Sequence, residues 1–430
     1  MNTQQQQALM VAAPQSGSGK TVITLALLRA LKDIGLDISA AKAGPDYIDP
    51  GFHAIASGRP SVNLDPWAMR TERLEDLAAA QAGSYLMVEA MMGLYDGAAD
   101  GSASPASLAK SLGMPILFVI DAARQSHSIA ALMRGFRDHD HGLNFAGIIL
   151  NRVGSARHET LLRNALADIE VPVLGAVPCD QKLGLPERHL GLVQAGETSE
   201  IENFIGAAGQ LIATHCDLEL IKDSFKPTKT DEKSVGRLPP LGQRIAIAQD
   251  NAFSFIYPHH VNDWREQGAE LSFFSPLKDE APNRDSDAIF LPGGYPELHG
   301  EALSEASGFK KSMLDHRHKG TLIYGECGGY MTLGEGLIDA DGNRHAMLGL
   351  LQLETSFEKR KLHLGYRQLK TNDFGLGERL RGHEFHYSSA LKAQGKPLFD
   401  VKDALGADLG TAGLRSDNVM GSYMHIIDRV

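Results

Sequence analysis

Short apolar runs alternate with amphipathic stretches over the first half of this chain. The runs are almost entirely apolar, as expected for strands that are buried on both faces of a parallel sheet. They cover residues 8–12, 38–42, 85–88, 116–120, 147–150 and 173–176. Between the first two runs, apolar residues recur at helical spacing from Ile23 to Ile34. This alternation of strands and helices predicts a doubly wound α/β sheet.

The pattern stops at a polar segment and then resumes. Residues 222–242 are charged, contain proline and glycine, and lack periodicity, which is typical of a linker. Four more apolar runs follow, at 244–248, 270–274, 288–291 and 321–324, before β-like alternation toward the C-terminus. We therefore predict a domain at 1–221, a linker at 222–242 and a second domain at 243–430.

Composition limits the classes of function. The formal charge of −11 argues against nucleic acid as a partner, because nucleic-acid binding usually requires a basic surface. The sequence has neither an apolar run of about 18 residues, which a membrane span would need, nor the features of a secretory signal. Cys179, Cys216 and Cys327 are too few and too scattered for a disulfide framework, which favours a reducing compartment and hence the cytoplasm.

A glycine-rich loop follows the first predicted strand and leads into the first predicted helix. It is typical of a phosphate-binding loop, whose backbone N–H groups and helix N-terminus hold phosphates. Its predicted ATP-binding residues are Ser16, Gly17, Ser18, Gly19, Lys20 and Thr21. Lys20 is expected to reach the β- and γ-phosphates and Thr21 to ligate Mg²⁺. Pro14 replaces the usual first glycine, so the loop is a variant.

Acidic residues follow two other predicted strands, at the edge where open α/β sheets bind ligands. Glu89 ends the run 85–88, and Asp121 ends the run 116–120. Two glycine-bearing acidic loops, at 42–50 and 89–97, are expected at the same edge. Because a nucleotide-bound metal requires a carboxylate, Glu89 and Asp121 are candidates for that role, and the two loops are expected to be functional.

Cys327 lies between glycines directly after the predicted strand 321–324. This context is typical of a nucleophile elbow, and we expect the helix that follows to lower the thiol pKa. The N–H of Gly328 and that of Gly294, in the loop 291–297, are candidates for an oxyanion hole. The partner base should be a histidine. His425 is favoured, and His383 and His386 are rivals.

Taken together, these motifs resemble one enzyme family. The second half resembles the class I glutamine amidotransferase domain of the cobyrinic/hydrogenobyrinic acid a,c-diamide synthases, on the motifs GGYPE, GECGGYM, GHEFHYS and GSYMH. The first half resembles the same family on the motifs AAPQSGSGKT, KAGPDYIDP and NLDPWAM and on the loop from Glu89 to Asp96. The first half of that family looks like dethiobiotin synthetase. The resemblance covers the whole chain. It implies a P-loop, dethiobiotin-synthetase-like sheet followed by a flavodoxin-like amidotransferase domain.

The resemblance also implies an activity and roles for residues. Cys327 and His425 would release ammonia from glutamine, and ATP·Mg²⁺ would activate the a and c acetates of the corrinoid as acyl phosphates in cobalamin biosynthesis. Asn151 would contact adenine. The residues implied for metal are Thr21, Asp46 and Glu89, and those implied for substrate or acyl phosphate are Lys42, Asp46, Tyr47, Glu89 and Asp96. Lys42 and Arg152 would offset the carboxylates of the substrate or, equally, be solvated surface charges.

One departure and several alternatives remain open. The usual His-x-Glu pair is replaced by His425-Ile426-Ile427, so Glu384, Asp428 or no residue orients His425. Hydrogenobyrinic acid is favoured as substrate over cobyrinic acid, and a Ni-sirohydrochlorin a,c-diamide synthase is a more distant alternative. A nucleotide-gated binding module with a vestigial amidotransferase domain is an alternative of a different class. A homodimer is the candidate assembly.

Overall fold

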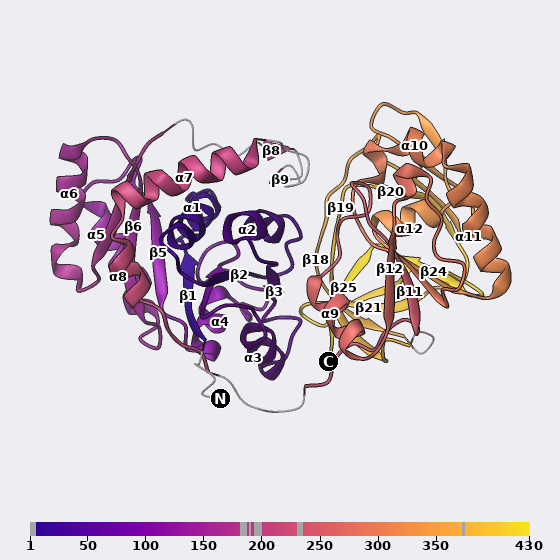
Figure 1. The fold of residues 1–430 in the computed structure, drawn as a ribbon, viewed down its shortest axis with the longest axis horizontal. Coiled ribbons are helices and arrows are strands. Elements are labelled where there is room, and N and C mark those ends of the chain that lie inside the picture. The colour runs from indigo at the N-terminus through magenta and orange to yellow at the C-terminus, as the bar shows by residue number, and fades with distance from the viewer. Residues whose placement is uncertain (1–5, 181–186, 189–190, 193–199, 230–234, 372–374) are drawn as a thin grey trace. The chain divides into compact units, whose positions relative to one another are not determined.

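The computed structural model describes residues 6–180, 187–188, 191–192, 200–229, 235–371 and 375–430. The chain divides into two compact units, Met1–Val235 and Gly236–Val430, and each is described by itself (Figure 1). The predicted linker starts at 222, whereas Lys226–Pro227 forms strand β10, which pairs with the first strand of the sheet. The first unit therefore extends further than the sequence pattern indicates, and the predicted domain limits stay a prediction.

The first unit is built on a parallel sheet with the strand order β3-β2-β4-β1-β5-β6-β7, to which β10 adds an antiparallel strand. The six apolar runs of the sequence are strands of this sheet, and the short strand β3 was not predicted. The strands are β1 (Gln7–Ala12), β2 (Ile38–Ala43), β3 (Val62–Leu64), β4 (Tyr85–Glu89), β5 (Ile116–Asp121), β6 (Phe145–Val153) and β7 (Val173–Pro178). A separate pair consists of β8 (Glu187–Arg188) and β9 (Gly191–Leu192).

Helices cover both faces of this sheet (Figure 1). Apolar side chains of α1, α2, α7 and α8 share one core cluster with the strands. The connections through α3, α4, α5 and α6 run along the sheet in the opposite direction, which places these helices on the other face because crossovers are right-handed. The helices are α1 (Lys20–Asp33), α2 (Asp49–Ser57), α3 (Thr71–Ala79), α4 (Pro105–Leu112), α5 (Ser128–His139), α6 (Ala156–Leu166), η1 (Ala167–Ile169), α7 (Ile201–His215) and α8 (Leu218–Asp223).

The second unit has a parallel sheet in the order β12-β11-β13-β14-β24, extended by the antiparallel strand β23. This is the flavodoxin-like order, in which the first strand is flanked by the second and third. The strands are β11 (Arg244–Ala248), β12 (Glu270–Phe274), β13 (Ala288–Leu291), β14 (Leu322–Glu326), β23 (Leu414–Ser416) and β24 (Val419–Ser422). The helices are α9 (Pro258–Glu266), η4 (Pro276–Lys278), η5 (Pro296–Leu298), α10 (Gly300–Glu305), α11 (Ser307–Lys319) and α12 (Gly328–Leu333).

Two smaller sheets complete this unit. One has the order β16-β15-β17-β20, and the other, which is antiparallel throughout, has the order β22-β21-β18-β19-β25. Their strands are β15 (Gly336–Ile338), β16 (Arg344–Ala346), β17 (Gln352–Ser356), β18 (His363–Lys370), β19 (Arg379–His386), β20 (Ser389–Gln394), β21 (Phe399–Asp403), β22 (Asp408–Ala412) and β25 (Met424–Arg429). Successive residues of a strand point to opposite faces of the sheet. Ala246 and Ile247 of β11 belong to different core clusters, so the parallel sheet is covered on both faces.

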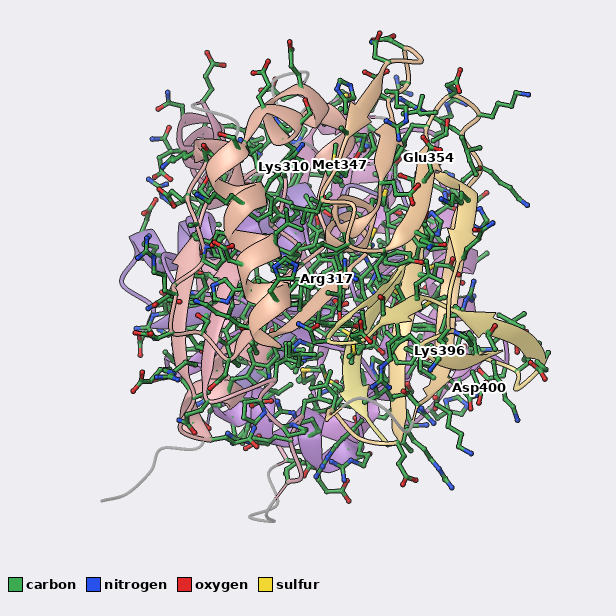
Figure 2. All side chains as sticks on the ribbon, turned by 90° about the vertical axis from the view of Figure 1, so that its right-hand side faces the viewer. Lys310, Arg317, Met347, Glu354, Lys396 and Asp400 are labelled. Carbon is green, nitrogen blue, oxygen red and sulfur yellow. The ribbon has the colours of Figure 1, made fainter. Side chains whose placement is uncertain are left out.

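A lysine fixes one of the covering helices. Lys310 of α11 donates to the carbonyl oxygens of Ser304 (2.7 Å) and Ala346 (2.8 Å), next to Met347; Figure 2 labels Lys310 and Met347. Burial lowers the pKa of Lys310.

In the part of the chain that the structure describes, no helix is both long and apolar enough to span a membrane.

Candidate active sites

The predicted phosphate-binding loop connects β1 to α1. Gly17 and Gly19 have φ angles of 80° and 83°, a region that strongly favours glycine. A Cβ atom on Gly19 would overlap the side-chain amide of Asn151. That amide donates from Nδ2 to the carbonyl of Ser18 (3.0 Å), and its Oδ1 accepts from the N–H of Arg152 (3.0 Å). Nδ2 of Asn151 therefore holds the loop, whereas Oδ1 binds the backbone of the next residue of β6, and the contact of Asn151 with adenine stays a prediction.

Arg152 forms a second connection between β6 and the loop. Its φ of 59° is unusual for a residue other than glycine. Its guanidinium donates to the carbonyl of Gly17 (3.0 Å) and to Oδ2 of Asp121 (2.5 Å). Asp121 at the end of β5 is thus paired with an arginine.

Glu89 is the centre of a buried polar network at the end of β4. Its Oε1 accepts from the Thr21 hydroxyl (2.7 Å) and from Lys42 Nζ (3.0 Å), and its Oε2 lies 2.6 Å from Nε2 of His53. Lys42 also pairs with Asp49 (2.5 Å). Because Lys42 is only 5% exposed, the alternative of a solvated surface charge is wrong for this residue.

The network holds its carboxyl groups in different states. Burial acts to raise the pKa of Glu89, but Lys42 and then His53 outweigh it, so this pKa lies well below its usual range. Burial raises the pKa of Asp49 to about 6 against the opposing effect of Lys42. Burial lowers the pKa of Lys20, whose Nζ donates to the carbonyl of Met92 (2.9 Å). Glu89 therefore remains an anion next to the phosphate-binding loop.

The remaining predicted residues of the first unit lie in the two acidic loops. Asp46 Oδ1 accepts from the N–H groups of Ile48 (2.6 Å) and Asp49 (3.1 Å) and so holds the start of α2. Asp96 accepts from the N–H of Gly93 (2.9 Å), and Tyr47 is half-buried. Sequence reasoning did not select Asp49 and His53 as site residues. Asp49 lies within the loop 42–50 and His53 follows it by one helical turn, and this spacing was the available signal.

Cys327 connects β14 to α12 in a strained conformation. Its φ of 44° and ψ of −102° fall outside the regions that residues with a Cβ atom usually occupy. Its N–H donates to the carbonyl of Ser422 (2.8 Å) on β24, and its Sγ lies 4.0 Å from the carbonyl oxygen of Phe385. The predicted nucleophile thus sits on a sharp strand-to-helix turn at the end of the parallel sheet.

The pKa of the Cys327 thiol is raised and not lowered as predicted. Burial, followed by the negative charge of Glu297, raises the pKa of Cys327, and the hydrogen bond from the Gly328 N–H opposes this only in part. The expectation that the helix start lowers this pKa is therefore wrong. Desolvation destabilises the thiolate more than the N–H groups at the helix start stabilise it. The raised pKa favours the neutral thiol form of Cys327.

His425 lies on β25, where its ring contacts the loop that follows β13. A Cβ atom on Gly293 would overlap this ring. The ring stacks on that of His383 at 4.9 Å, and burial lowers the pKa of His425 well below its usual range. A neutral imidazole is the form that can accept a proton from a thiol.

Comparison with known proteins identifies both units. Residues 9–193 match the CobQ/CobB/MinD/ParA nucleotide binding domain, and residues 244–429 match the CobB/CobQ-like glutamine amidotransferase domain. A hydrogenobyrinate a,c-diamide synthase of Rhizobium meliloti is 56% identical, with 98% of this chain and 99% of that protein covered. Proteins of that name from Brucella anthropi and Rhodobacter capsulatus are 55% and 46% identical, over 97% of this chain and 98% of each relative. The chain belongs to the hydrogenobyrinate a,c-diamide synthase family.

Membership in this family confirms the resemblance and the predicted fold class.

The structure also shows which acidic residues lie near His425. Glu384 accepts from Arg367 (2.9 Å) and lies 2.9 Å from Nε2 of His386, and Asp428 accepts from the N–H of Arg429 (2.9 Å). Glu326, which sequence reasoning did not weigh, has its Oε2 atom 3.8 Å from Nδ1 of His425.

Glu326 is held in place by two donors. Its Oε1 accepts from the Tyr324 hydroxyl (3.1 Å) and the N–H of Ile426 (3.3 Å). Burial raises the pKa of Glu326 to about 8. Its position directly before the predicted nucleophile in GECGGYM was the only sequence signal. The pairing of β14 with β24 places Glu326 opposite Ser422, three residues before His425.

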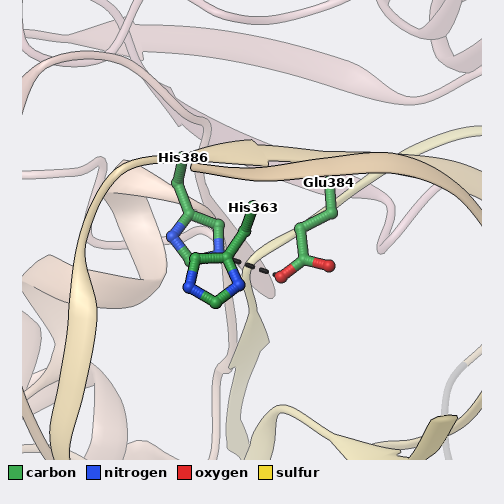
Figure 3. A group of neighbouring side chains, drawn as sticks. All are labelled: His363, Glu384 and His386. Atoms are coloured by element: carbon green, nitrogen blue, oxygen red, sulfur yellow. Dashed lines mark hydrogen bonds and ion pairs between the residues drawn. The ribbon is translucent and has the colours of Figure 1, made fainter. Parts of the chain in front are cut away.

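His363, Glu384 and His386 form a second cluster in this family member (Figure 3). Their ligand atoms lie within 4.8 Å of one another. The two imidazole rings are stacked at 4.6 Å and 7°, so their nitrogen lone pairs lie in separate parallel planes and do not meet at one point. Glu384 is also paired with Arg367. This geometry is that of a hydrogen-bonded polar cluster and does not suit a shared metal ion. His386 is held in the cluster by Glu384 and by stacking on His363.

The two predicted oxyanion donors lie in adjacent segments. A Cβ atom on Gly328 would lie 3.0 Å from the backbone nitrogen of Gly294 and 2.8 Å from Cδ of Pro296. The loop after β13 therefore packs directly against the start of α12. This arrangement suits two N–H donors, and the role of Gly294 and Gly328 stays a prediction.

Proposed function

We propose that this protein amidates the a and c acetate side chains of hydrogenobyrinic acid, with ATP as the energy source and glutamine as the source of ammonia. The observation that carries this proposal is the 56% identity over 98% of the chain to a hydrogenobyrinate a,c-diamide synthase. The two candidate sites are consistent with it, because one has a phosphate-binding loop and the other a cysteine on a strained turn.

The glutaminase reaction would begin at Cys327. His425 accepts the thiol proton, and Sγ attacks the carboxamide carbon of glutamine while N–H groups of Gly294 and Gly328 hold the developing oxyanion. The C–N bond then breaks, ammonia leaves with the proton from His425, and water hydrolyses the thioester to glutamate. We propose Glu326 as the residue that positions His425, in place of the missing His-x-Glu acid.

The synthetase reaction would take place at the end of β1 and β4. A carboxylate oxygen of the acetate attacks the γ-phosphorus of ATP, and ADP leaves. Ammonia attacks the resulting acyl phosphate, and inorganic phosphate leaves as the amide forms. Phosphorylation is required because a free carboxylate is a poor electrophile. Each amide consumes one glutamine and one ATP.

The residues around Glu89 fit a bound Mg²⁺. Thr21 Oγ1 and Glu89 Oε1 are hard oxygen donors, 2.7 Å apart beside the loop, and such donors are the usual ligands of this ion. Mg²⁺ would offset the charge of the phosphates. Lys20 would contact the phosphates. The corrinoid carboxylate and its acyl phosphate would be bound by Lys42, Asp46, Tyr47 and Asp96. We further propose a cytoplasmic location. We also propose a homodimer, and light scattering of the purified protein tests this assembly state.

Incubation with defined substrates tests the proposal. The purified protein is given Mg·ATP, glutamine and either hydrogenobyrinic acid, cobyrinic acid or Ni-sirohydrochlorin, and the products are analysed by mass spectrometry. We expect two amides on hydrogenobyrinic acid. Two amides on only one of the other substrates would reassign it, and no amide on any of them would contradict the proposal.

A nucleophile variant separates the two half-reactions. Cys327→Ala should release no glutamate yet should still form amides when ammonium salts replace glutamine. A wild-type protein that binds ATP but releases no glutamate would instead support the nucleotide-gated binding module.

A further inference from the structure

Glu297 is a half-buried residue in η5, directly after the loop that packs on the start of α12. Its Oε2 atom is inaccessible and has no hydrogen-bond partner within the part of the chain that the structure describes. A buried polar atom without a partner costs free energy, so such an atom next to a reactive centre points to a group that arrives with a ligand.

Three carboxyl groups act electrostatically on Cys327: Glu297, Glu326 and Glu384. Two of them are already paired within the protein. Glu326 accepts from Tyr324 and Ile426, and Glu384 binds Arg367 and His386. Glu297 is the one of the three with an oxygen, Oε2, that has no hydrogen-bond partner among the described residues, although Arg360 acts on its carboxyl group electrostatically. Its effect on the thiol is the largest of the three.

On this basis we propose that Glu297 binds the α-ammonium group of glutamine. The inference rests on the proposed glutaminase activity and adds the residue that selects its substrate. Glutamine carries its ammonium group four bonds from the carboxamide carbon that Cys327 would attack. A substrate placed with that carbon at Sγ therefore brings a cation into the surroundings of the nucleophile, where Glu297 supplies the matching anion.

The same contact would prepare the nucleophile. In the free enzyme the negative charge of Glu297 adds to burial in raising the pKa of Cys327, which disfavours the thiolate. A bound ammonium group would stabilise the carboxylate and cancel its field at Cys327. The free enzyme would then keep a neutral, unreactive thiol, and the amino acid substrate itself would favour the thiolate.

The test compares substrates as well as variants. Glutaminase kcat/KM is measured for L-glutamine and for 5-amino-5-oxopentanoic acid, which is glutamine without its amino group, in the wild type, in Glu297→Gln and in the exposed control Glu301→Gln. For the wild type and the control we expect a preference of about 10- to 100-fold for glutamine, since losing a charge-assisted hydrogen bond has about this effect. In Glu297→Gln the preference should fall to nearly equal values, through a loss on glutamine alone.

Equal losses on both substrates, or an unchanged preference, would overturn the inference, because a purely structural role does not depend on the amino group. In Glu297→Gln the kcat/KM for 5-amino-5-oxopentanoic acid should match the wild type, which shows that the second unit of the variant is folded, because this reaction uses the same nucleophile. A wild type that fails to hydrolyse glutamine would contradict the proposed function, whereas an active wild type with an unchanged preference in the variant would contradict this inference alone.

Discussion

Replacing Glu326 by glutamine tests the electrostatic description of the glutaminase site. Glutamine retains an oxygen that can accept from Tyr324 and Ile426, so the hydrogen bonds of the wild type are kept. The variant loses the ability to ionise, and an amide nitrogen replaces the oxygen that faces Nδ1 of His425. Any change in the pH dependence of stability therefore reports on the buried carboxyl.

The magnitude follows from the pKa. In the folded protein it is raised from the ordinary 4.5 to about 8, a difference of roughly 3.5 pH units, and at about 1.4 kcal/mol per unit this is on the order of 5 kcal/mol. Because the folded-state pKa is the higher one, the stabilising contribution is complete below the unfolded value and is lost as the pH rises through about 8. Glu326→Gln should not show this loss.

Denaturant unfolding at pH values near 5, 7 and 9 provides the measurement. A Trp67→Phe background leaves Trp264, which is buried in the second unit, as the fluorescent reporter. We expect the free energy of unfolding of Glu326→Gln, relative to the wild type, to increase by several kcal/mol from the lowest to the highest pH. The exposed Glu270→Gln should run parallel to the wild type. Parallel curves for Glu326→Gln as well would refute the reasoning.

Three further substitutions address the loops that hold the reactive groups. Asn151→Ala should raise the KM for ATP about tenfold, because it removes the hydrogen bond to Ser18; steady-state ATPase assays with the exposed Asn164→Ala as control decide this. Gly19→Ala should reduce nucleotide binding by about 100-fold or more, since its φ of 83° and the Asn151 amide exclude a Cβ atom; binding of a fluorescent ATP analogue measures it. Gly293→Ala should displace the His425 ring and lower glutaminase kcat, while ammonia-dependent amidation, assayed in parallel, is unchanged.

Sequence patterns predicted the strands that are apolar along their whole length and missed those that are short or half-exposed. The runs at 116–120 and 288–291 correspond closely to β5 and β13. Strand β3, with three residues, is too short for a periodicity signal. Strands β18 and β19 form a long antiparallel pair, but their mixed exposure hides them among the polar residues of the C-terminal region.

The candidate sites show a similar limit. Glycine-flanked motifs revealed Lys20 and Cys327, because their chemistry depends on local backbone geometry. The role of Glu326 depends on a strand register that no local pattern contains. The raised thiol pKa of Cys327 was missed for a related reason, since desolvation depends on everything packed around the sulfur, whereas the helix start is visible in the sequence.

Lys42 shows how strongly burial can change the meaning of a charged residue. It is the cation between Glu89 and Asp49, and all three groups are nearly inaccessible. Lys42→Met would leave two carboxylates together in a buried site, so we expect a loss of about 3–5 kcal/mol in the free energy of unfolding near pH 8. The pKa of Asp49, already raised to about 6, should rise further without Lys42.

A carboxyl with a raised folded-state pKa loses stability as the pH rises, so the deficit of Lys42→Met should shrink toward pH 5, where Asp49 is neutral. Adding Asp49→Asn to Lys42→Met should restore part of the stability at pH 8, because it removes one of the two carboxylates that Lys42 had neutralised. Urea unfolding of the single and double variants at both pH values measures this. A deficit independent of pH, or a double variant less stable than Lys42→Met, would show that Lys42 acts through packing of its aliphatic chain and not through its charge.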